Sequence, residues 1–198
     1  MNTAMRGYIR VVDAVNYRIG RIMMYGIFIM MAILLWSSIS KTFFVPSLWT
    51  LEMAQFAMVA YYIMGGPYSI QLGSNVRMDL FYGAWSDRRK AWFDACTVMF
   101  LIFYLGVLLY GGLGSTAYSL GHFSDTPFAF YGDLIRAFLT GGPEGAGEVI
   151  GRVERSSTAW RPFLWPIKFF MCLGILLMLL QAISELCKDL LRLKGEAV

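Results

Sequence analysis

The sequence predicts an all-α integral membrane protein. We expect four transmembrane helices, an in-plane amphipathic arm helix between spans two and three, and short helices in a long outer loop. Hydrophobic residues make up 58% of the 198 positions, and the mean hydropathy is +0.56. A soluble domain this apolar would lack the polar surface needed to cover itself. A charged, aromatic segment at residues 72–96 separates two long apolar runs, which predicts the arm.

Four apolar runs have the length of membrane spans. A spanning helix needs about 20 mainly apolar residues. The fourth run reaches this length because Lys168 and Glu185, at its two ends, can snorkel toward water. We place the spans, within a single membrane domain of residues 1–198, at about residues 19–40, 49–71, 94–121 and 166–187.

The segment at about residues 75–93 is predicted to be the in-plane arm. Each charged residue costs about 2.5–3.5 kcal/mol at the bilayer centre, so this segment cannot cross the membrane. A plain loop would not need its many aromatic rings. Rings facing lipid and charges facing water are typical of a helix in the membrane surface. The candidate anchoring residues of the arm are Arg77, Asp79, Trp85, Arg88, Arg89, Lys90 and Trp92.

The distribution of Lys and Arg predicts the orientation. These residues are concentrated in the tail before the first span, in the arm, and in the tail after the fourth span. The positive-inside rule places such segments in the cytoplasm and gives less weight to long loops. We therefore expect both termini in the cytoplasm and a loop at about residues 122–162 outside. Residues 1–21 are polar and basic, so we expect the first span to be an uncleaved anchor.

The outer loop is expected to contain two short helices. Residues 133–139 form an amphipathic piece, and Gly141-Gly142-Pro143 should break it before a second helix at residues 144–155. Trp160 and Trp165 are typical of the aromatic belt at a membrane interface. Inside the second span, Gly65-Gly66-Pro67 should kink the helix or end it early.

Several residues are candidates for subunit contacts. Glu52 lies near the outer end of the second span, where a structural or interface role is favoured over ion or substrate binding. Gln181 and Glu185 are one turn apart near the inner end of the fourth span. Arg77 and Asp79 each have a partner or face headgroups and water, and the Arg88–Lys90 run binds anionic lipid or a specific partner. The small residues Gly111, Gly112, Gly114 and Ser115 are expected to pack against another helix.

The sequence excludes several classes of function. It has one histidine and three scattered cysteines, so neither a bis-histidine haem nor a disulfide framework is expected. There is no nucleophile–base pair, phosphate-binding loop, metal-ligand spacing or nucleic-acid motif. No span carries a charge in its middle, unlike most ion-coupled transporters. We expect no catalytic, metal-binding or substrate-binding residue and no cofactor, and infer that the chain supports transport carried out elsewhere.

Two ordered motifs resemble a known family. LGSNVRMDLFYGAWSDRRKAWFD, at residues 72–94, is similar to the segment after the second span in the small membrane subunits of tripartite ATP-independent periplasmic (TRAP) transporters. SSTAWRPFLWPIKFFMCLGILLMLLQAISELCKDL, at residues 156–190, resembles the fourth span of that family. The resemblance implies a non-catalytic scaffold subunit in the bacterial inner membrane. Its implied partners are a large multi-span subunit with the substrate and sodium sites, a periplasmic binding protein that delivers an organic acid, and membrane lipids.

Two alternatives stay open. A self-assembling small transporter or channel would use the small-residue patch and Glu52 to line a pathway between copies. A membrane-bound redox subunit is disfavoured by the single histidine. Flux through the isolated chain would favour the first alternative, and a haem or quinone absorption spectrum would favour the second.

Overall fold

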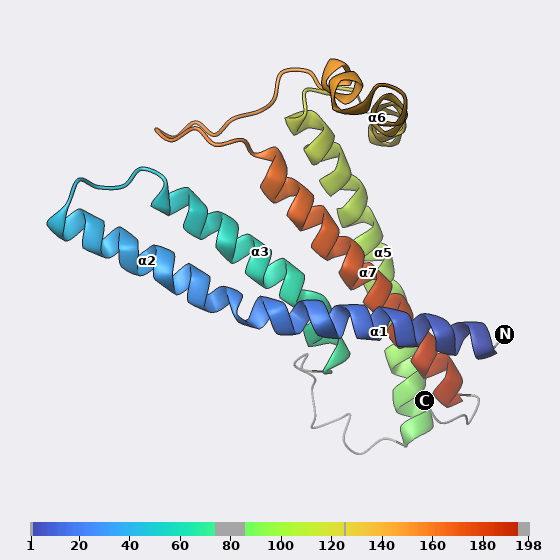
Figure 1. Ribbon diagram of the computed structural model, residues 1–198. Coiled ribbons are helices and arrows are strands. Elements are labelled where there is room, and N and C mark those ends of the chain that lie inside the picture. Colours follow the sequence, from blue (N-terminus) through green and yellow to red (C-terminus); the bar gives the residue numbers. More distant parts are fainter. Residues whose placement is uncertain (1, 74–85, 125, 194–198) are drawn as a thin grey trace. The chain divides into compact units, whose positions relative to one another are not determined.

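The computed structural model describes residues 2–73, 86–124 and 126–193. These residues form helices joined by short irregular segments, and within them the one β-type pairing is an isolated bridge between Arg155 and Phe163. The class predicted from the sequence, an all-helical chain, is therefore confirmed. The helices, labelled in Figure 1, are α1 (Asn2–Met24), α2 (Gly26–Phe43), α3 (Thr50–Gln71), α5 (Asp87–Ser119), α6 (Pro127–Val149) and α7 (Trp165–Leu193).

Three helical segments are long and apolar enough to cross a membrane. They are Thr3–Phe43, Trp92–Ser119 and Trp165–Leu193. They contain the predicted first and fourth spans and all but the last two residues of the predicted third span. The predicted second span is a helix, α3, but α3 is not among these three, so the number of four spans stays a prediction. The polar residues Glu52, Gln55 and Gln71 and the proline Pro67 lie within α3.

The N-terminal residues form a helix rather than the polar tail expected. In α1, Ile9, Val12, Asn16 and Gly20 are buried. Their spacing of three to four residues is that of one helix face. The composition of the N-terminal segment did not predict this helix, because basic residues occupy its other faces.

The predicted arm is only partly covered by the structure. Residues 75–85 lie outside the described residues. The rest of the arm, up to residue 93, belongs to α5, which begins at Asp87 and continues without a break into the third predicted span. The arm as a separate helix therefore stays a prediction.

The chain divides into two compact units, each with its own core. The first comprises residues 1–28, 61–108 and 173–198. Its core includes Met64, Leu105, Ile175 and Leu177, all less than a tenth exposed. Small residues allow the helices to approach closely here, because a Cβ atom on Gly174 of α7 would lie 2.2 Å from Cγ2 of Ile63 on α3.

The second unit comprises residues 29–60 and 109–172. Its core includes Ala117, Phe130 and Cys172. Gly112 packs as expected, since an added Cβ would lie 3.0 Å from Sγ of Cys172, whereas the space beside Gly111 and Gly114 is open. The break predicted at Gly141–Pro143 is confirmed: Gly142 has φ 64° and ψ −152°, which is non-helical and favoured by glycine.

Three local predictions are corrected. The outer-loop helix α6 begins at Pro127, six residues before the predicted piece, because the apolar residues before Asp133 extend the same pattern. The helical turns after Gly142 end at Val149 and not at Arg155. Gly65-Gly66-Pro67 does not end α3 early, since the helix continues to Gln71, and the alternative of a kink at these residues stays a prediction.

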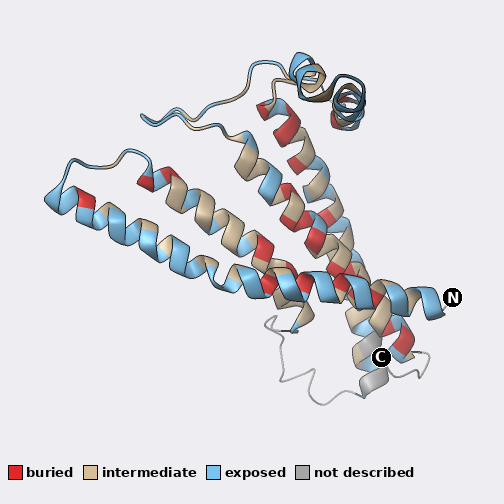
Figure 2. Ribbon diagram, viewed as in Figure 1, coloured by how far each residue is buried: buried red, intermediate tan, exposed pale blue. Residues whose placement is uncertain are grey.

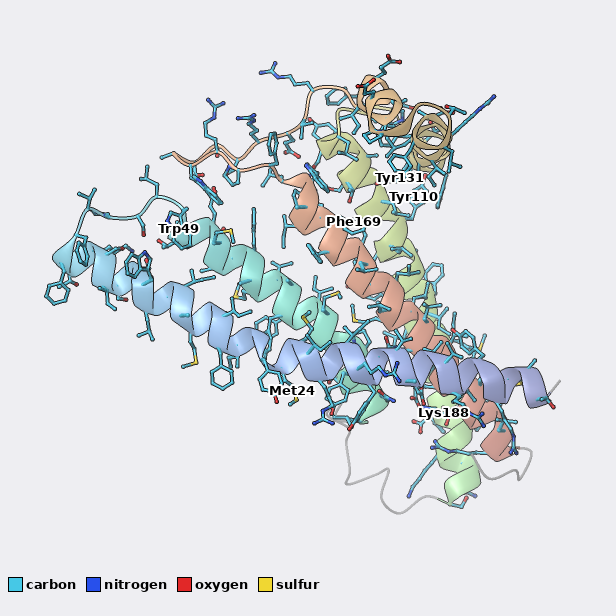
Figure 3. All side chains as sticks on the ribbon, viewed as in Figure 1. Met24, Trp49, Tyr110, Tyr131, Phe169 and Lys188 are labelled. Carbon is cyan, nitrogen blue, oxygen red and sulfur yellow. The ribbon has the colours of Figure 1, made fainter. Side chains whose placement is uncertain are left out.

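One helix is almost entirely exposed. In α2 only Ser40 is buried, although the helix is mostly apolar, and Figure 2 shows it exposed along nearly its whole length. Large apolar side chains such as Phe28, Ile29 and Leu35 are about three-fifths exposed. Figure 3 shows the side chains of the helices as sticks on the ribbon. A long, mostly apolar surface of this kind is typical of contact with lipid or another protein.

Candidate functional site

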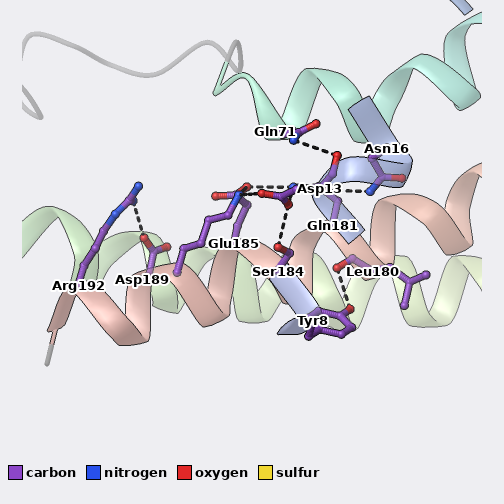
Figure 4. Close-up of polar contacts among 11 residues, drawn as sticks. Tyr8, Asp13, Asn16, Gln71, Leu180, Gln181, Ser184, Glu185, Asp189 and Arg192 are labelled. Carbon is purple, nitrogen blue, oxygen red and sulfur yellow. Dashed lines mark hydrogen bonds and ion pairs between the residues drawn. The ribbon is translucent and has the colours of Figure 1, made fainter. Parts of the chain in front are cut away.

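A polar cluster in the first unit joins α1 to α7. We call it the α1–α7 cluster, and it consists of Asp13, Asn16, Gln181, Ser184, Glu185 and Lys188 (Figure 4). At its centre, Nζ of Lys188 lies 2.7 Å from Oδ2 of Asp13 and 2.7 Å from Oε1 of Glu185. One ammonium group therefore bridges two carboxylates. The side chains of all three are at most 22% exposed, so water screens these charges only weakly.

Gln181 completes the cluster and is fully buried. Its Nε2 donates to Oδ1 of Asp13 and to Oε1 of Glu185, both at 3.0 Å. Its Oε1 accepts a 2.7 Å hydrogen bond from Nδ2 of Asn16. Ser184 donates a further hydrogen bond of 3.0 Å to Oδ1 of Asp13. The amide thus has two donors and its acceptor in use, which fixes how α1 crosses α7.

Backbone groups extend these contacts. The Tyr8 hydroxyl donates to the carbonyl oxygen of Leu180 at 3.0 Å, and Nε2 of Gln71 on α3 donates to the carbonyl oxygen of Asp13 at 3.2 Å. The N-terminal helix is therefore tied to both α7 and α3 within the first unit.

A second polar contact, in the second unit, holds the outer loop. The carboxylate of Glu154 accepts hydrogen bonds from Nζ of Lys168 at 2.8 Å and from the Ser119 hydroxyl at 2.6 Å. Lys168 also donates to the carbonyl oxygen of Ser115 at 3.3 Å. The hydrogen bond from Lys168, followed by that from Ser119, holds the pKa of Glu154 below its usual value.

This pKa shift predicts an acid-sensitive loop contact. Because the folded-state pKa is lowered, the contact stabilises the loop above the usual pKa and is lost as the pH falls through the lowered value. We expect the hydrogen-exchange protection of residues 150–164, corrected for the intrinsic exchange rate at each pH, to fall on acidification below the usual glutamate pKa of 4.5. The Glu154→Gln variant should show the faster exchange already at neutral pH, at a cost of about 1 kcal/mol or less. Glu148→Gln, an exposed site on α6, is the matched control; equal exchange in both variants would contradict the prediction.

Glu52 forms a third polar contact, also in the second unit. Its side chain is buried, with 4% of the residue exposed. Oε1 accepts hydrogen bonds from the hydroxyls of Ser156, at 2.6 Å, and of Thr158. Oε2 is buried without a hydrogen-bond partner among the described residues. Glu52 therefore connects the first turn of α3 to the segment that precedes α7.

The predicted site residues do not gather in one place. Gln181 and Glu185 lie in the α1–α7 cluster, whereas Glu52 and Lys168 hold the outer loop. Trp160 and Trp165 are each 40% exposed, and Arg89 and Trp92 are exposed beside Leu193. Lys90 is half-buried in α5. Arg77, Asp79 and Trp85 lie outside the described residues, and of Arg88 only the helical backbone is described.

Sequence reasoning missed the partners of these residues. Asp13 and Asn16 were overlooked because the N-terminal segment was judged by its charge, although both lie near the buried face of α1. Lys188 was counted only as a cytoplasmic charge, yet it follows Glu185 by one helical turn, a spacing typical of an ion pair. No local sequence pattern predicts the contacts of Glu154, because its partners Ser119 and Lys168 are distant in the sequence.

These features define the class of protein. Long helices with exposed apolar surfaces, and polar side chains engaged in contacts between helices, are those of a helical membrane protein. Within the described residues, no group of three or more His, Cys, Asp or Glu side chains is placed to hold a metal ion.

Comparison with known proteins identifies the family. The model of the family described as "Tripartite ATP-independent periplasmic transporters, DctQ component" matches residues 30–192. The chain therefore belongs to this family, the small membrane components of TRAP transporters, as the two sequence motifs predicted. Searches of curated proteins and of solved structures found no match. The matched region begins within α2, so α1 lies outside it.

Proposed function

We propose that this chain is the non-catalytic scaffold subunit of a sodium-coupled TRAP importer. In this proposal it binds and anchors the large transport subunit in the bacterial inner membrane. The large subunit holds the sodium ions and the substrate, an organic acid that a periplasmic binding protein delivers. Both termini face the cytoplasm, and the loop at residues 122–162 faces the periplasm.

The observation that carries this proposal is the contrast between charged and apolar side chains. Asp13, Glu185 and Lys188 are engaged with one another, and Glu154 is engaged with Lys168. These groups serve internal contacts, which suits a rigid support. The mostly apolar α2, with only Ser40 buried, offers a long surface for another membrane subunit.

Candidate contact residues for the large subunit follow from the arm and from α2. We propose that Arg77, Asp79 and the Arg88–Lys90 run, with Trp85 and Trp92, contact the large subunit or the lipid around it. Trp160 and Trp165 would anchor the start of α7 at the outer membrane surface.

Copurification tests the proposal. A tagged full-length chain, expressed with the large subunit of its transporter, should recover that subunit in a fixed ratio. The double variant Ile29→Ala/Trp36→Ala changes one face of α2, and Ile27→Ala/Leu34→Ala changes the opposite face. Because losing a large apolar anchor costs about 2 kcal/mol or more at an interface, one pair should lower recovery strongly and the other should not. Recovery of this chain alone, as a homo-oligomer that conducts ions, would overturn the proposal.

A further inference from the structure

A cavity lies between the C-terminal half of α1 and the second half of α3, inside the first unit. Its volume is about 340 Å³, within the range of small-molecule pockets. Its walls are mainly apolar and aromatic, and they include Gly20, Met23 and Met24 of α1 and Tyr61, Tyr62 and Gly65 of α3. Gly65 helps to keep the cavity open, because no other atom lies within 4 Å of the position that a Cβ atom on Gly65 would take. The cavity suits a flexible apolar chain.

A positive charge lies next to this cavity. The guanidinium carbon of Arg21 lies 5.7 Å from the ring centroid of Tyr17. The Tyr17 ring packs edge-on against Tyr68, with 5.7 Å between centroids, and Tyr68 is part of the cavity wall. Arg18 is exposed as well, but it precedes Gly20 by two residues and so lies on the opposite side of α1 from the cavity wall. The apolar cavity therefore has one arginine, Arg21, at its edge.

The neighbouring face of α1 is apolar and exposed. Val11, Val15 and Ile22 recur at intervals of four and seven residues, and they are 63%, 41% and 66% exposed. Arg18 lies on this same face, between Val15 and Ile22. A helix with exposed apolar residues and arginines is typical of the membrane surface, where the aliphatic groups enter lipid and the arginines extend to the headgroups. The α1–α7 cluster fixes which faces α1 exposes.

We infer that α1 and α3 form a binding site for an anionic phospholipid. One acyl chain occupies the cavity, and the phosphate and its anionic headgroup are bound by Arg21. Charge complementarity favours lipid over an apolar protein segment, because an apolar segment would leave the guanidinium group of Arg21 without a counter-charge. The inference needs only that the chain is a membrane protein, and the α1 wall of the site lies outside the segment that matches the family.

Native mass spectrometry of the delipidated full-length chain tests the inference. The protein is titrated with phosphatidylglycerol or with phosphatidylcholine of the same acyl chains. Each arginine near an anionic lipid surface contributes about fivefold in affinity. The Arg21→Gln variant should therefore bind phosphatidylglycerol about fivefold more weakly, with its affinity for phosphatidylcholine unchanged. Gly65→Leu, which fills the cavity, should weaken binding of both lipids.

Two matched controls make the result specific. Arg136→Gln removes an exposed arginine from α6, and Gly111→Leu adds a side chain in open space on α5; neither should change lipid binding. Equal affinity of the wild type for the two lipids would overturn the inference. The inference would also be overturned if the cavity variants kept lipid binding but no longer bound the large subunit, because the cavity would then accommodate protein.

Discussion

The Lys188→Met variant is expected to release α1 from α7. The substitution leaves Asp13 and Glu185 as two carboxylates without the ammonium group that lies 2.7 Å from each. Removing one partner of a buried ion pair costs about 3–5 kcal/mol, and the slight exposure of this cluster places the expected loss near 3 kcal/mol. Thermal unfolding in detergent measures the loss, and hydrogen exchange should show α1 opening while α5 stays protected.

A control and a second variant separate this effect from a general loss of charge. Lys41→Met removes an exposed lysine from the last turn of α2 and should leave α1 protected. The double variant Asp13→Asn/Lys188→Met should be less destabilised than the two single changes predict together, by about 1–3 kcal/mol, because Asp13 and Lys188 are in contact. Unchanged protection of α1 in Lys188→Met would contradict the role of the cluster.

Gly174→Ala is expected to destabilise the first unit although alanine favours helices. The added Cβ would lie 2.2 Å from Cγ2 of Ile63 and 3.1 Å from the Ile63 carbonyl group, so α3 and α7 must separate. Overpacking of this kind typically costs about 1–3 kcal/mol, and it outweighs the helix propensity gained, about 1 kcal/mol. The midpoint of thermal unfolding should therefore fall.

Gly106→Ala is the matched control, because nothing lies within 4 Å of the added methyl group on α5. It should raise stability by about 0.5–1 kcal/mol, so the two substitutions should have opposite signs. Ile63→Ala should restore part of the stability lost in Gly174→Ala, since it removes the nearest atom. A stabilising Gly174→Ala would show that the two helices do not approach as closely as described.

Much of the fold could be predicted because it rests on local chemistry. Runs of apolar residues give the helices that cover the first and fourth predicted spans and nearly all of the third. The glycine and proline at residues 142 and 143 predict the break in α6, since glycine tolerates the φ value found there. The early start of α1 could also be predicted from the spacing of Ile9, Val12 and Asn16. This required testing the helical periodicity of a segment whose composition is polar.

The contacts at the candidate site could not be predicted in the same way. Asp13 and Lys188 belong to helices at opposite ends of the chain, and a single sequence carries no signal that pairs two charges so far apart. Gln181 and Glu185 could be recognised as a polar pair because they are one turn apart. Their partners on α1 depend on how the helices pack, which local patterns do not determine.

Uptake by reconstituted vesicles tests the central claim most directly. Proteoliposomes contain the large subunit with or without this chain, and the binding protein, the substrate and a sodium gradient are supplied to both. We predict sodium-dependent uptake only when this chain is present, and none from vesicles that contain this chain alone. Full uptake by the large subunit and binding protein without it would contradict the scaffold role, and so would flux through this chain by itself.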